Sequence, residues 1–139
     1  MLGDIIPPDN LKYRFIFESK NYTNLDTHNL LNPKGCKTVS GWINELAYDI
    51  ESAIMCNQKN VIGFLLIKLK QKGNWIVGNM GNILNTIKTD GSIVFPYPYL
   101  IFEHKVKEEL TIENYDNYFF LCDFNSFIEK NHQLLFEVI

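Results

Sequence analysis

Residues 40–70, SGWINELAYDIESAIMCNQKNVIGFLLIKLK, decide the fold class of this chain. From Trp42 to Ile54 the apolar side chains recur every three or four positions, and polar side chains occupy the opposite face. This spacing predicts an amphipathic helix over residues 41–56, with Ser40 as its N-cap. The apolar run at 61–70 is bounded by turn residues and predicts a central β-strand. A long helix followed directly by a strand indicates that helix and sheet pack against each other.

Further strands are predicted on both sides of this unit. Residues 11–19, LKYRFIFES, alternate between two faces and predict a half-buried strand. QKGN at 71–74 predicts a hairpin turn into a strand over 75–87. Later strands are expected at 94–102, 118–124 and 133–139, with a helix at 124–132 capped by Asp123. The sequence therefore predicts one α+β domain over residues 1–139, with a mostly antiparallel sheet of about five to six strands, the long helix and a shorter C-terminal helix.

The stretch DGSIVFPYPYLIFEHK, residues 90–105, carries two prolines among aromatic residues. Backbone N–H groups of a strand point alternately to its two edges, so Pro96 and Pro98 would remove two donors from the same edge. This predicts a strand at the border of the sheet. Exposed tyrosines are common in protein interfaces, and we therefore predict a partner-binding surface at Tyr97, Tyr99 and Glu103.

Charge is unevenly distributed along the 139 residues, which carry a net charge of -3. Residues 103–139 hold three lysines and eight acidic residues, a net charge of 3 − 8 = −5. Glu45 and Asp49, one turn apart on the exposed face of the predicted helix, are a second candidate partner-binding site. Acidic surfaces attract basic proteins, and this favours a basic protein as the partner. A surface that serves only solubility is the alternative interpretation.

No catalytic or metal-binding motif stands out. The three histidines and three cysteines are scattered without ligand spacing, and GNMGN at 78–82 fits neither a phosphate loop nor a dinucleotide fingerprint. The glycines of that stretch are expected at a bulge or a close backbone approach. Arg14 is the only arginine, which argues against a nucleic-acid partner. No metal, no cofactor and no catalytic residue are expected.

Three function classes remain open. The favoured hypothesis is a small acidic protein-binding module without catalytic activity. Its general character is similar to that of bacterial immunity proteins, which neutralise toxins by direct binding. The second is an enzyme whose site is assembled from scattered residues such as Glu18, His28, Cys36, Tyr97 and His104. The third is a structural or ligand-binding subunit, which includes a homo-oligomer. Unpaired cysteines and the absence of an apolar leader or membrane span predict a cytoplasmic protein with no membrane partner.

Overall fold

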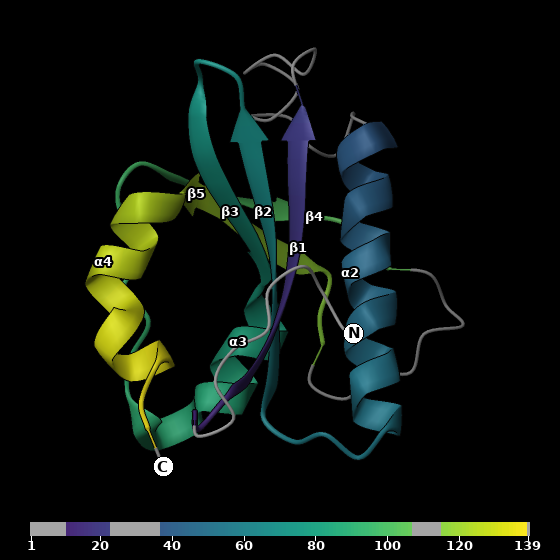
Figure 1. Cartoon of the computed structure of the whole chain (residues 1–139), viewed down its shortest axis with the longest axis vertical. Coiled ribbons are helices and arrows are strands. Elements are labelled where there is room, and N and C mark those ends of the chain that lie inside the picture. Colours follow the sequence, from purple (N-terminus) through teal and green to yellow (C-terminus); the bar gives the residue numbers. More distant parts are fainter. Residues whose placement is uncertain (1–10, 23–36, 107–114, 139) are drawn as a thin grey trace.

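The computed structural model describes residues 11–22, 37–106 and 115–138. Their elements, in chain order, are β1 (Arg14–Tyr22), α2 (Lys37–Met55), β2 (Val61–Leu69), β3 (Gly73–Asn79), α3 (Met80–Ile87), the 3-10 helix η2 (Lys88–Asp90), β4 (Tyr99–Glu103), β5 (Tyr118–Asp123) and α4 (Phe124–Leu135). The strands form one sheet in the order β1-β2-β3-β5-β4. Helix α2 covers one face of the sheet, and α3 and α4 cover the other (Figure 1).

The sheet is mixed, because β1 and β2 run parallel while the other three neighbouring pairs are antiparallel. Parallel neighbours need a crossover connection, and α2 provides it between β1 and β2. The predicted α+β class is thus confirmed, with five strands, the long helix and the C-terminal helix. Asp123 caps α4 as expected, since its carboxylate accepts a hydrogen bond from the Ser126 amide at 2.8 Å.

Two apolar cores lie on the two faces of the sheet. Between α2 and the sheet, the buried residues include Ile16, Ile43, Leu46, Ile50, Leu65 and Phe119. Between the sheet and α3 and α4, they include Phe15, Phe17, Phe64, Ile83, Phe120 and Phe127. Residues 15–17 of β1 are therefore all buried, and the predicted half-buried strand is in fact covered on both faces over this part.

The predicted strand at 75–87 is wrong in its second half. β3 ends at Asn79, whose side chain accepts a hydrogen bond from the Asn82 amide at 2.9 Å and so begins α3. The predicted strand at 133–139 is also wrong, because α4 continues to Leu135 and only Val138 forms an isolated bridge, with Leu11. At Gly78 a close approach does exist, since an added Cβ would lie 2.7 Å from Phe120 Cε1.

The proline-rich stretch enters the sheet later than predicted. β4 begins at Tyr99, so Pro96 and Pro98 precede the strand instead of blunting one of its edges. The segment before it is held by α4, because the Asn131 side chain bonds both the amide and the carbonyl of Val94 at 2.8 Å. β4 is nevertheless an edge strand, as predicted, because among the described strands it pairs with β5 alone. Among the described residues, no helix is long and apolar enough to cross a membrane.

Candidate active site

The second half of β1 carries a carboxylate and an ammonium group on one face. Side chains two apart in a strand point the same way and lie about 7 Å apart. Ile16 packs into the core beneath α2, so Glu18 and Lys20 also lie on the α2 side of the sheet. Burial decreases along this face, from Ile16 at 2% exposed to Glu18, which is partly exposed. The face thus leads from apolar core to a polar site at the border of the sheet.

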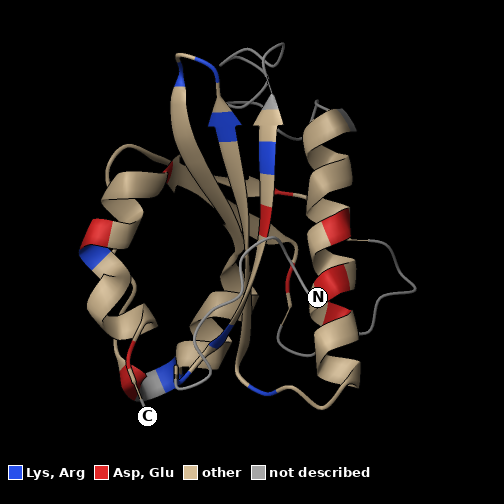
Figure 2. Cartoon of the chain, viewed as in Figure 1, with Lys and Arg blue, Asp and Glu red and all other residues tan. Residues whose placement is uncertain are grey.

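Helix α2 contributes an acidic partner to this face. Lys20 Nζ lies 3.0 Å from Glu45 Oε2, with side chains 27% and 56% exposed. Leu46, the next residue, is fully buried against the sheet, and this fixes the rotation of the helix that presents Glu45 to β1. Figure 2 shows further acidic bands along α2 beside β1. The fold therefore places Lys20 against Glu45 of the helix, on the strand face that also carries Glu18.

The five predicted partner-binding residues fall into two groups. Glu45 and Asp49 lie on α2, one turn apart, and Glu45 is the residue that contacts Lys20. Tyr97, Tyr99 and Glu103 lie in or just before β4, the edge strand at the other end of the sheet order. Tyr97 is 92% exposed and Tyr99 48%. No finding tests whether these residues bind a protein, and that surface stays a prediction.

Of the other residues considered for a scattered catalytic site, the described ones, Tyr97 and His104, flank β4, at the other end of the strand order from Glu18 in β1. His104 follows β4, where its Nε2 lies 3.0 Å from Asn44 Oδ1 of α2. Partial burial lowers the pKa of His104 below its usual value. His28 and Cys36 lie outside the described residues. No group of three or more His, Cys, Asp or Glu side chains that could hold a metal ion occurs within the described ranges.

A carboxylate and an ammonium group on one face are also the groups that enzymes acting on phosphate esters use. In such enzymes carboxylates hold divalent cations, and a lysine stabilises the negative charge that develops on the phosphoryl group. The family model described as phage putative PDDEXK endonuclease matches residues 1–132, and the chain belongs to this family. No curated protein and no solved structure matched the chain.

This family membership overturns the favoured sequence-based hypothesis. A non-catalytic inhibitor of the immunity-protein kind is wrong as the function class, because the family is one of endonucleases, which are enzymes. The expectation of no catalytic activity is wrong for the same reason. Absence of the usual hydrolase and metalloprotease motifs misled the interpretation, since a nuclease site needs only a few carboxylates and a lysine.

The sequence contains residues that fit the family description but that were not recognised as a motif. In the family description, the letters PDDEXK denote a two-part motif. The first part is a Pro-Asp pair, and the second part, further along the chain, is Asp or Glu, any residue and Lys. Glu18-Ser19-Lys20 fits the second part, and Pro8-Asp9 fits the first part nine residues before Glu18. Asp9 lies outside the described residues. The available signal was an acid and a lysine two positions apart at the end of a strand, preceded by a proline–aspartate pair.

Proposed function

We propose that this protein hydrolyses phosphodiester bonds of nucleic acid at the face of β1 that carries Glu18 and Lys20. The observation that carries the proposal is the Glu-x-Lys sequence on one strand face, with Lys20 Nζ held 3.0 Å from Glu45. Family membership over residues 1–132 supports the same reaction class. The proposal makes nucleic acid the partner at this site, in place of the basic protein that the acidic final third favours.

The residues present fit a divalent cation such as Mg²⁺ in the type of donor they offer. Carboxylate oxygens are the protein ligands that Mg²⁺ prefers, and Glu18, with Asp9 upstream, offers two of them. When bound, such a cation supplies Lewis-acid activation of water and of the phosphoryl oxygen. Glu18 would hold and orient this group at the rim of β1.

Lys20 has the separate task of charge stabilisation. Hydrolysis adds a water oxygen to phosphorus and breaks one P–O ester bond, which leaves a phosphate monoester and a free hydroxyl group. Negative charge rises on the phosphoryl oxygens during this exchange, and a fixed ammonium group beside them lowers the barrier. Glu45 holds that ammonium group on the side of β1 that also carries Glu18.

Glu18→Gln and Lys20→Met test the proposal. Each variant should reduce the cutting of single-stranded and double-stranded DNA and RNA by about 100-fold or more, because each removes one charge that acts in the transition state. Cutting is measured in the presence of Mg²⁺ by gel electrophoresis. Circular dichroism should show that both variants stay folded, because both side chains lie at the partly exposed end of the strand face.

Glu129→Gln and Lys130→Met are matched controls on the exposed face of α4. Both should cut as well as the unmodified protein. If the Glu18 and Lys20 variants retain full cutting, the site is not on β1. If the unmodified protein cuts none of the four substrates with Mg²⁺ or Mn²⁺, the proposed function itself is wrong.

A further inference from the structure

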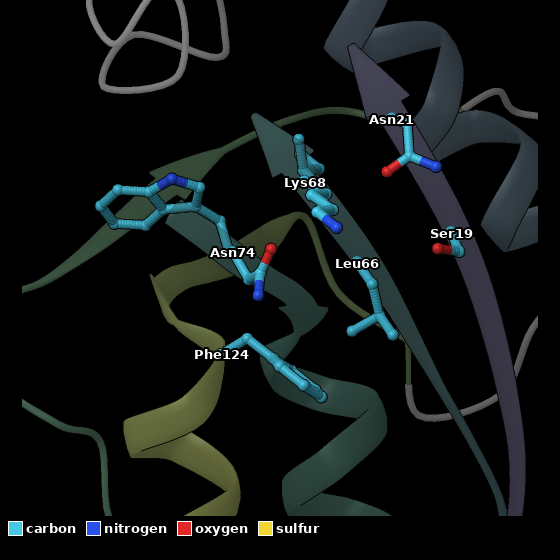
Figure 3. A pocket seen from close by; sticks show the side chains of 8 residues that line it. Ser19, Asn21, Leu66, Lys68, Asn74 and Phe124 are labelled. Atoms are coloured by element: carbon cyan, nitrogen blue, oxygen red, sulfur yellow. The ribbon is translucent and has the colours of Figure 1, made fainter. Parts of the chain in front are cut away.

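A groove opens on the face of the sheet opposite to Glu18 and Lys20. Its side chains come from three adjacent strands and from the start of α4, and those that carry the argument are Ser19, Asn21, Leu66, Lys68, Asn74 and Phe124 (Figure 3). Ser19 and Asn21 flank Lys20 in the sequence, and neighbouring residues of a strand point to opposite faces. The groove and the proposed active site therefore lie back to back across the same edge strand.

Strand register aligns three polar groups of this groove in one row. Asn21 of β1 pairs with Lys68 of β2, and Lys68 pairs with Asn74 of β3. Adjacent strands lie about 4.8 Å apart, so the row spans about 10 Å. Figure 3 shows the two amides on either side of Lys68. Asn21 and Lys68 are exposed, and Asn74 is partly exposed. Two amides, which both donate and accept hydrogen bonds, thus flank one cation.

The floor of the groove is apolar. Leu66 and Phe124 are partly exposed and pack against the buried core between the sheet and α4. Figure 3 places the Phe124 ring on the α4 side of the row, below Asn74. An aromatic ring beside polar groups offers a stacking surface to a nucleobase, whose edge carries donors and acceptors that amides match.

Positive charge gathers at this end of the sheet. Lys68, Lys70 and Lys72 lie there, within residues 52–89, a stretch that contains no acidic residue although the whole chain has a net charge of -3. Lys70 and Lys72 are exposed in the turn between β2 and β3, next to the groove. Figure 2 shows the basic residues at this hairpin and at the end of β1. Phosphate groups are the natural counterions of such a lysine cluster.

We infer that the groove binds an unpaired nucleotide of the nucleic-acid strand that the enzyme cuts. The inference rests on the proposed function. The base stacks on Phe124 and bonds the amides of Asn21 and Asn74, and Lys68 contacts a phosphate. A strand that passes over the edge at β1 reaches both the groove and the Glu18–Lys20 face. A duplex is stiff over about 150 base pairs and cannot fold around one strand of a sheet, whereas an unpaired strand can.

The test is a binding measurement that needs no cutting. In a Glu18→Gln background, fluorescence anisotropy compares a labelled 12-nucleotide single strand of mixed sequence with the corresponding duplex. The single strand should bind more tightly than the duplex. Phe124→Leu should weaken single-strand binding by about 5- to 100-fold, because base stacking on a ring is lost. Lys68→Gln should reduce the slope of log K against log salt by about 0.7, which corresponds to one phosphate contact.

Asn74→Ala, an exchange at the rim of the groove, provides a variant that does not depend on the packing of α4. It should weaken single-strand binding without lowering the melting temperature. Tyr118→Leu and Lys130→Gln are the matched controls, since both are exposed outside the groove, and they should bind like the parent. Wild-type-like binding by the Phe124, Lys68 and Asn74 variants overturns the inference, and so does a duplex that binds as tightly as the single strand.

The outcome for the groove is separable from the outcome for the active site. If Glu18→Gln loses cutting but the groove variants bind the single strand like the parent, the proposed function stands and the inference about the groove is wrong. If the groove variants lose single-strand binding and the unmodified protein shows no cutting, the groove is supported and the proposed function is wrong.

Discussion

Asn82 shows how a single side chain completes the sheet. β3 pairs with β2 only from Phe64 onward, so the start of β2 lacks a partner strand on that side. Asn82 of α3 takes the missing place: its Oδ1 accepts from the Gly63 amide at 3.1 Å, and its Nδ2 donates to the Val61 carbonyl at 2.9 Å. Asn82 is only 5% exposed, so water cannot replace these bonds. The side chain therefore acts as a short substitute for a neighbouring strand.

Asn82→Ala should lower the free energy of unfolding by about 2–5 kcal/mol, because it leaves one buried N–H and one buried C=O without a partner. Urea denaturation followed by circular dichroism measures the change. Asn125→Ala, an exposed asparagine on α4, should change it by less than about 0.5 kcal/mol. Equal effects of the two substitutions would show that the Asn82 bonds contribute nothing to stability.

At the level of elements, periodicity predicted the long segments well, although α2 begins at Lys37 and Ser40, the predicted N-cap, lies inside it. The helix spacing from Trp42 to Ile54, the QKGN turn and the Asp123 cap all correspond to observed features. Helix α3 was missed because its eight residues follow β3 without a break and are as apolar as a strand. Its signal was Asn79, which caps the helix three residues before Asn82.

The pairing of strands and the site could not be obtained from local pattern. The parallel alignment of β1 with β2 depends on how α2 crosses the sheet, and this is a property of packing. Glu45 and Asp49 were selected for their charge on an exposed face, whereas the structure gives Glu45 a contact with Lys20. Glu18 was considered only as one member of a scattered catalytic site, without Lys20. Only its position two residues from Lys20, on the face below α2, distinguishes it.

The contact between α2 and β1 gives a prediction about Glu45 as a positioning residue. Glu45→Gln should reduce kcat for nucleic-acid cutting by about 10-fold, because the ammonium group of Lys20 loses the charge that orients it. KM should stay unchanged, since Glu45 is not expected to contact the substrate. Glu45→Asp should restore part of the activity. Because Glu45 is 56% exposed, the melting temperature of both variants should stay close to that of the parent.

Glu129→Gln serves as the matched control, being an exposed glutamate on α4. A higher KM with an unchanged kcat would instead show that Glu45 contacts the substrate. Full activity in Glu45→Gln would mean that Lys20 needs no partner on α2.

At the scale of the whole molecule, α2 joins the two edge strands of the sheet. It contacts β1 through the Lys20–Glu45 ion pair, and its Asn44 Oδ1 lies 3.0 Å from Nε2 of His104, just after β4. His104 also packs on Phe119, with ring centroids 6.0 Å apart. Helix and sheet are therefore connected at both borders, and the connection at β4 contains the ionisable imidazole of His104.

The stability of the protein should decrease as the pH falls below about 6.5, the usual pKa of histidine in an unfolded chain. Partial burial lowers the pKa of His104 in the folded protein, so over this range the unfolded chain binds the proton more readily. The stabilising contribution of neutral His104 is complete above the unfolded pKa and is lost as the pH falls through the folded pKa.

The urea midpoint, measured at pH 8, 7, 6 and 5, tests this coupling. It should fall more steeply with decreasing pH for the parent than for His104→Gln, because the glutamine amide cannot take up a proton. Asn125→Ala, an exposed exchange on α4 that removes no titratable group, should follow the parent curve. Parallel curves for the parent and His104→Gln would show that His104 does not couple protonation to folding.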